Sequence, residues 1–198
     1  MARPSIYSGP AVLSYGFRPF FFMGALYAGL SVLLWMPQYY GEVSLPTLMA
    51  PVDWHIHEML FGFLSAVITG FLFTAVPNWT GRMPITGWPL LVLVVLWMAG
   101  RVAMTFSADI GWGAAMVIDV AFLVAVLGVI AVEIFAGKNW RNFRVLVPLA
   151  LLIAANVGFH LEAHSQGITD VSRRAALAAA IILIMLIGGR IIPSFTRN

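Results

Sequence analysis

Long apolar stretches separated by short polar connectors dominate the pattern of this chain. Six stretches reach or approach the roughly 20 residues that a helix needs to cross a hydrocarbon core of about 30 Å. They are Phe17–Met36, His57–Val76, Gly87–Phe106, Trp112–Phe135, Phe143–His160 and Ala175–Ile192. Because unpaired backbone groups cannot face lipid, each stretch is expected to be helical. The pattern predicts an all-α polytopic membrane protein, with one domain of six spans over residues 1–198.

Turn-forming residues and tryptophans mark the ends of the predicted spans. Pro37 and Gly41 follow the first span, and Pro77 and Gly81 follow the second, so the helices are expected to end near them. Tryptophans form an aromatic belt near the span ends, as expected for a membrane protein: Trp35, Trp54, Trp79, Trp88, Trp112 and Trp140.

Composition supports the membrane reading and excludes several other classes. The chain is 61% hydrophobic and only 10% charged, whereas soluble domains average about 25% charged residues. Cysteine is absent, which excludes disulfides and thiolate metal sites. No Lys/Arg-rich run suits nucleic acid. Arg18 precedes the first stretch, which lacks a small-residue cleavage site and is therefore expected to stay as a helix.

Basic residues flank the spans unevenly. If the chain starts in the cytoplasm, the inner flanks receive eight basic residues, namely Arg3, Arg18, Arg82, Lys138, Arg141, Arg144, Arg190 and Arg197. The outer flanks receive three, namely Arg101, Arg173 and Arg174. The positive-inside rule therefore favours cytoplasmic termini.

All four histidines of the chain fall on the same predicted membrane face. His55 and His57 stand where the second span begins, and His160 and His164 stand where the fifth span ends. With cytoplasmic termini, both places are on the outer side. This convergence makes the four histidines candidate metal ligands.

The second histidine pair has a spacing that suits one helix face. His160 and His164 are four residues apart, and Asn156 lies one turn deeper on the same stripe. A polar stripe in a membrane helix is expected to face the bundle interior. The prediction requires that the helix persists beyond His160.

The first pair cannot share a helix face, since two residues correspond to about 200° of rotation. The second span carries a row of small residues typical of close helix packing, namely Gly62, Ala66 and Gly70. Helical phase places His55 and Glu58 nearer that row than His57. We therefore rank His55 ahead of His57 as the inward ligand, and Glu58 as a partner that orients an imidazole.

Two interpretations of the histidines have about equal weight from these residues alone. Imidazole suits iron, copper and zinc, and the lack of cysteine favours haem iron or copper. Alternatively, the histidines are interfacial side chains that meet both lipid and water. Met59 and Met104 suit copper but are also ordinary helix filler.

Two charged residues lie within spans that form a tight hairpin. Arg101 is in the third span and Asp119 in the fourth, at similar depth. A structural ion pair is the simpler interpretation. The alternative is that Arg101 binds an anionic cofactor group such as a haem propionate, which a guanidinium matches in shape.

Several motifs along the chain resemble the NnrS family of bacterial membrane proteins. They are GFRPFF (16–21), WHIHEMLFGF (54–63), GFLFTAVPNWTGR (70–82), LLVLVVLWMAGR (90–101) and GGRIIPSFTRN (188–198). The resemblance implies haem and copper as cofactors, and a role in nitric oxide metabolism and protection from nitrosative stress in the bacterial inner membrane. It does not assign each histidine to one metal, and it leaves enzymatic turnover undecided.

Family members have about twelve spans at roughly 20 residues each, so the resemblance is to their N-terminal half. We therefore expect a homodimer that replaces the missing half, with nitric oxide as a ligand. Two rival functions fit a six-span chain: a half-size transporter that dimerises, and a membrane cytochrome for electron transfer. A two-haem cytochrome would require histidines near the inner side, and the chain has none there.

Overall fold

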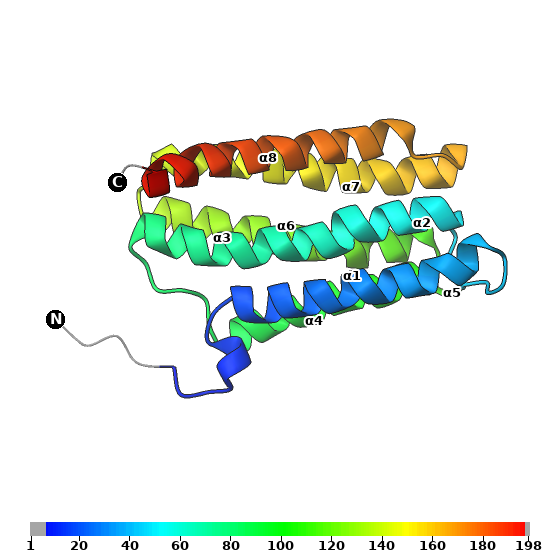
Figure 1. Ribbon diagram of the computed structural model, residues 1–198, viewed down its shortest axis with the longest axis horizontal. Coiled ribbons are helices and arrows are strands. Elements are labelled where there is room, and N and C mark those ends of the chain that lie inside the picture. The colour runs from blue at the N-terminus through cyan, green and yellow to red at the C-terminus, as the bar shows by residue number, and fades with distance from the viewer. Residues whose placement is uncertain (1–6, 197–198) are drawn as a thin grey trace.

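The computed structural model describes residues 7–196 and consists of helices and their connections over that range (Figure 1). The α-helices are α1 (Phe17–Tyr39), α2 (Pro51–His57), α3 (Leu64–Thr80), α4 (Trp88–Thr105), α5 (Ser107–Ile110), α6 (Trp112–Ala136), α7 (Leu146–Gln166) and α8 (Asp170–Thr196). Two 3₁₀ helices, η1 (Ala11–Leu13) and η3 (Trp140–Val145), precede α1 and α7. A π-helix, η2 (Glu58–Phe63), joins α2 to α3.

Within the described part of the chain, six helical stretches are long and apolar enough to cross a membrane, which confirms the predicted fold. The second and the fifth are longer than predicted because short helical segments continue them. The second runs without a break from Pro51 through η2 to Thr80, and the fifth runs from Trp140 to Gln166. Pro51 starts α2 at a position where the missing N–H of proline leaves no intrahelical bond unmade.

The first two spans end near their predicted proline and glycine signals, at Tyr39 and at Thr80, although each proline itself lies in the last turns of its helix. Pro37 lies inside α1 and Pro77 inside α3. Membrane helices tolerate such prolines because neighbouring groups satisfy the freed backbone. The second span ends before Gly81, whose φ of 70° gives the left-handed cap that glycine adopts without strain.

The long second span forms the centre of the bundle. In its most apolar window 67% of residues are buried, compared with 22% for α1 and 28% for α8. α3 packs against α1 on one side and α6 on another, while α4 packs on α6 and α8 on α7 (Figure 1). Residues of the second span therefore have protein neighbours on several faces, and more than one face of it is inward.

The connections α1–α2, α4–α5–α6 and α7–α8 lie at one end of the bundle (Figure 1). We call this the histidine end, because α2 begins there and α7 finishes there. All four histidines lie on these two elements near that end. The structure thus brings together residues that are separated by about a hundred positions in the chain.

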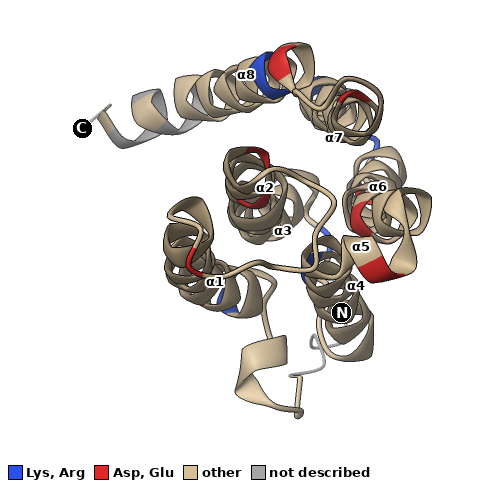
Figure 2. Cartoon of the chain, turned by 90° about the vertical axis from the view of Figure 1, so that its right-hand side faces the viewer, with Lys and Arg blue, Asp and Glu red and all other residues tan. Residues whose placement is uncertain are grey.

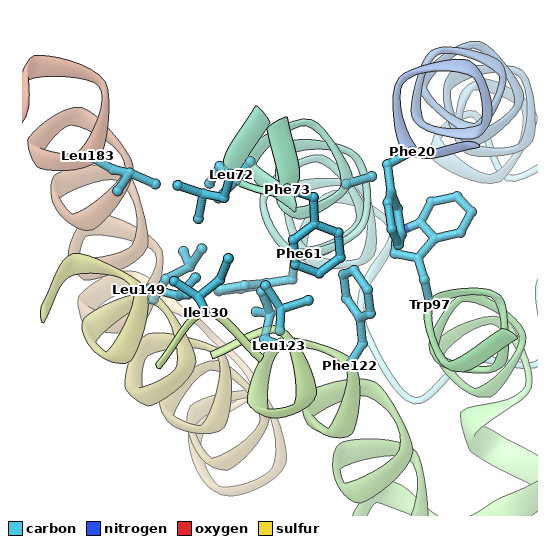
Figure 3. Packing of buried hydrophobic residues seen from close by; sticks show 14 of the residues in the cluster. Phe20, Phe61, Leu72, Phe73, Trp97, Phe122, Leu123, Ile130, Leu149 and Leu183 are labelled. Atoms are coloured by element: carbon cyan, nitrogen blue, oxygen red, sulfur yellow. The ribbon is translucent and has the colours of Figure 1, made fainter. Parts of the chain in front are cut away.

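Away from the histidine end, the helices are held by a continuous apolar core. Figure 3 shows side chains of α1, α3, α4, α6, α7 and α8 meeting in it. Leu72, Ile130 and Leu149 are each at most 1% exposed. This core joins the helices that carry the polar residues described next.

Candidate metal centre

Seven polar side chains from five spans meet inside the histidine half of the bundle. Figure 2 shows charged positions on α2, α4 and α6, which are neighbouring helices in the end-on view. This polar cluster consists of Tyr27 (α1), His57 (α2), Glu58 (η2), Arg101 (α4), Asp119 (α6), and Asn156 and His160 (α7). Apart from the half-buried Tyr27, each is at most 6% exposed. Charges this deep are tolerated only when they are paired and hydrogen-bonded.

Arg101 joins the two carboxylates of the cluster. Its Nη1 donates to Glu58 Oε2 at 2.6 Å, and its Nη2 donates to Asp119 Oδ1. The Tyr27 hydroxyl donates to the same Glu58 oxygen. The ion pair expected between Arg101 and Asp119 is therefore present, and Glu58 completes it as a second anion. A single guanidinium fork spanning two carboxylates fixes the relative positions of η2, α4 and α6.

Asp119 is the centre of the other half of the cluster. Its Oδ2 lies 3.2 Å from His57 Nε2, 3.2 Å from His160 Nε2, and 2.8 Å from the donating Asn156 Nδ2. The two imidazole rings are 5.1 Å apart between centroids, at an angle of 75°. One potential ligand atom each from His57, Asp119 and His160 lies within 4.8 Å of the other two.

The atoms around His57 favour a positive charge on its ring or a metal ion beside it. Its Nδ1 lies 3.1 Å from Glu58 Oε1, while its Nε2 faces both Asp119 Oδ2 and Asn156 Oδ1, the latter at 3.1 Å. Both ring nitrogens thus face oxygen acceptors, but a neutral imidazole has only one N–H. A second proton or a metal ion at Nε2 would satisfy the arrangement. In either case Glu58 orients the ring, as carboxylates do for metal-binding histidines.

Two glycines make room for the cluster. A Cβ added at Gly62 would lie 2.5 Å from Arg101 Nη1 and 3.0 Å from Glu58 Oε2. A Cβ at Gly100 would lie 3.2 Å from Asp119 Oδ1. The absence of side chains at these two positions lets the arginine and the carboxylates approach within hydrogen-bonding distance.

The ranking of His55 ahead of His57 as the inward residue is wrong. His57 is fully buried in the cluster, whereas His55 is only partly buried and stacks on Trp35 of α1 at 4.2 Å. The row of small residues does form a close-packing face, with Ala66 against Gly24 of α1 and Gly62 beside Arg101 of α4. The histidine that enters the cluster is on another face of the same central helix.

The prediction for His160 and His164 required the helix to continue beyond His160, and α7 does continue to Gln166. His160 enters the cluster, and Asn156 one turn below it does too. His164 does not: it is exposed and stacks on Trp112 at 4.2 Å. A cavity of about 130 Å³ separates the two environments, with both His160 and His164 in its wall.

Met49 and Met104 are also in the wall of this cavity. Met104 was one of two methionines that suited copper, and the structure places it beside His160 and His164 without assigning it a ligand role. The cavity connects the polar cluster with the end of the bundle.

Five of the seven predicted site residues therefore lie together, namely His57, Glu58, Arg101, Asn156 and His160. Sequence reasoning did not include Asp119 among the ligands or Tyr27 in the site at all. Asp119 is an acidic residue two helical turns inside an apolar stretch, which is a usable signal of function. Tyr27 has no such signal, because tyrosine is ordinary near the ends of membrane helices.

Comparison with known proteins identifies the family. A family model described as NnrS protein matches residues 11–198. No curated protein and no solved structure matches the chain. The match spans nearly the whole sequence, including every residue of the polar cluster, and the chain belongs to the NnrS family.

Proposed function

We propose that this chain binds a transition metal ion, copper in the first place, through His57, Asp119 and His160, and acts in the nitric oxide response. Membership of the NnrS family supports the role in nitric oxide response. The observation that carries the metal site is the approach of three potential ligand atoms within 4.8 Å of one another in a buried setting.

The donor set fits a single metal ion. Two imidazoles and one carboxylate are ligands that copper, zinc and iron accept. His57 already has the arrangement of a ligand, with Nδ1 beside Glu58 and Nε2 facing Asp119. Arg101 balances part of the negative charge, so the site as a whole would carry a divalent ion without a large excess of charge.

Haem fits the same place less well. The cavity beside His160 measures about 130 Å³, below the roughly 300–1,000 Å³ of pockets for drug-sized ligands. A porphyrin is too large for it. Haem, if this chain holds it, would use His55 or His164 at the edge of the bundle, each now stacked on a tryptophan.

The residues of the cluster would hold the metal and limit access to it. A copper ion with an open coordination position would supply a binding place for nitric oxide, a small neutral molecule that crosses lipid. Asn156 and Glu58 orient His57 from both sides. The cavity lined by His164 and Met104 gives a route from the end of the bundle to His160.

Metal content of single variants tests this proposal. Protein from copper-supplemented cells would be assayed by mass spectrometry for copper, iron and zinc, with nitrogen ligands counted by electron paramagnetic resonance. We expect His57→Gln and His160→Gln to lose most of the bound metal. His55→Gln and His164→Gln are matched controls, because they change the same residue type outside the cluster, and they should retain it.

Equal metal content in all four variants, each folded, would contradict the proposal and leave the cluster as a structural ion network. Loss only in the His55 and His164 variants would move the site to the edge of the bundle. Zinc or iron in place of copper would keep the ligands and correct the metal.

The membrane orientation is a separate part of the proposal. The eight-to-three distribution of basic residues favours cytoplasmic termini, which would put the histidine end in the periplasm. A reporter active only in the periplasm should work when fused at Thr47 and fail at Lys138. The reverse result would place the histidine end in the cytoplasm.

We also propose that the chain forms a homodimer. The supporting observation is that only 28% of the residues in the apolar window of α8 are buried, so this helix offers a broad lateral face to a second copy. Mass measured by light scattering in mild detergent should correspond to two chains. A strictly monomeric protein with full metal content would show that the metal site needs no second copy.

A further inference from the structure

A second hollow lies on the side of the bundle, between α1 and α4. It measures about 560 Å³ and its wall is almost entirely apolar. Leu26, Leu30 and Val102 contribute to it and are themselves 59%, 52% and 57% exposed. Because these helices face lipid, the groove opens to the bilayer rather than to water. Its volume is in the range of sites for drug-sized ligands.

The inner wall of the groove carries one small polar patch. Tyr27 and Arg101, both members of the polar cluster, line it together with Trp97. The rings of Tyr27 and Trp97 are 5.5 Å apart between centroids and nearly perpendicular. Arg101 uses both Nη atoms on carboxylates, while its buried Nε has no hydrogen-bond partner among the residues that the structure describes. An unmade hydrogen bond at a buried guanidinium is unfavourable, so a ligand in the groove whose acceptor reaches this Nε would be stabilised.

The charges next to the groove favour a neutral hydrogen-bond acceptor over an anionic one. The one cation of this wall, Arg101, is already matched by Glu58 and Asp119. An anionic head group would therefore meet two carboxylates for one guanidinium. A carbonyl oxygen accepts the hydrogen bond without adding charge.

Depth in the membrane distinguishes the carbonyl groups of phospholipids from those of other membrane molecules. Tyr27 lies twelve residues before the last residue of α1 (Phe17–Tyr39), which is about 18 Å along a helix, so its side of the groove lies well below the end of the span. The ester carbonyls of phospholipids lie at the interface, more than a helical turn away. A carbonyl-bearing ring on an apolar tail reaches this depth. A histidine-ligated haem does not suit the groove, because histidine is absent from the lining residues.

We propose that the groove between α1 and α4 binds a membrane quinone, with a ring carbonyl accepting a hydrogen bond from Arg101 and the ring lying against Tyr27 and Trp97. The isoprenoid tail leaves along the apolar residues toward lipid. The site adjoins the proposed metal centre through Arg101 and Glu58, but the binding does not depend on a metal there.

Titration of the full chain in saturated phosphatidylcholine nanodiscs with decylubiquinone tests the proposal, with empty nanodiscs as the background. Leu30→Trp and Val102→Trp fill the groove and should weaken binding by at least about tenfold, a change that is readily measured. Leu33→Trp and Val95→Trp are matched controls: they lie on the same helices, are 72% and 55% exposed, and are not in the groove wall. They should bind as the parent does.

Decylbenzene, which has the tail and a ring but no carbonyls, separates recognition from partitioning. It should bind at least about tenfold more weakly than the quinone, the scale of one hydrogen bond to a charged group. Equal binding of the two compounds, or undiminished quinone binding in both groove-filling variants, would overturn the proposal. A tightly held phospholipid that decylubiquinone cannot displace would overturn it as well.

Discussion

The two halves of the bundle are held together by different kinds of interaction. In the half away from the histidines, Leu72, Ile130 and Leu149 pack as an apolar core (Figure 3). In the histidine half, the same spans meet through a guanidinium, two carboxylates and two imidazoles. The apolar half depends on shape and volume, and each side chain contributes separately. The polar half depends on charge balance, so one missing member leaves its partners buried and unpaired.

The largest expected effect is from removing the one cation of the cluster. Arg101→Met should destabilise the protein by about 3–5 kcal/mol, because two buried carboxylates lose their partner. Arg82→Met is the matched control, since Arg82 also pairs with a carboxylate, Glu133, at 2.6 Å but is 44% exposed. It should lose at most about 1 kcal/mol. Thermal unfolding in detergent would compare them, and similar losses would remove the distinction between the two kinds of ion pair.

The apolar half should respond less strongly to a single truncation. Leu149→Ala should destabilise by about 2 kcal/mol, the low end of the range for buried leucines, because the membrane already provides an apolar solvent and mainly the cavity term is left. Leu151→Ala, at a 48% exposed position of the same helix, should change little. If Leu149→Ala exceeded the effect of Arg101→Met, the apolar half would be the more sensitive one.

Gly62 tests how closely the polar half is fitted. Gly62→Ala should destabilise by about 1–3 kcal/mol through overpacking, since the new methyl would press on Arg101 and Glu58. Gly128→Ala is the control, because nothing lies within 4 Å of a Cβ there, and helix propensity should make it neutral or slightly stabilising. Unfolding temperatures of the two variants are the measurement. An unchanged unfolding temperature in Gly62→Ala would show that the ion pair of Arg101 and Glu58 can shift to make room for the methyl group.

The smallest effect is expected at the edge of the cluster. Tyr27→Phe removes one hydrogen bond to Glu58 but leaves that carboxylate paired with Arg101, so the loss should be about 1 kcal/mol. Metal content should be unchanged, because Tyr27 contacts neither His57 nor His160. Loss of metal in this variant would extend the centre to α1.

The spans and the convergence of histidines at one end could be predicted from the sequence because both depend on length and order along the chain. The inward residue of the second span could not. The direction in which each residue of this helix points was predicted from the small-residue row of Gly62, Ala66 and Gly70. That row correctly predicts one packing face, but a central helix has several such faces. Asp119 as the meeting point was missed for a similar reason: sequence gives the depth of a residue but not which helices surround it.

The π-helix Glu58–Phe63 has a consequence for how this site can change during evolution. A π turn holds a wider loop of backbone than an α turn, and such segments recur at functional sites. Deleting one residue there would restore an ordinary α-helix and rotate everything before it by about 100° relative to α3. His57 would then leave the cluster while the apolar core stayed packed. A single codon in this segment is therefore enough to take apart the polar cluster while its apolar scaffold is kept.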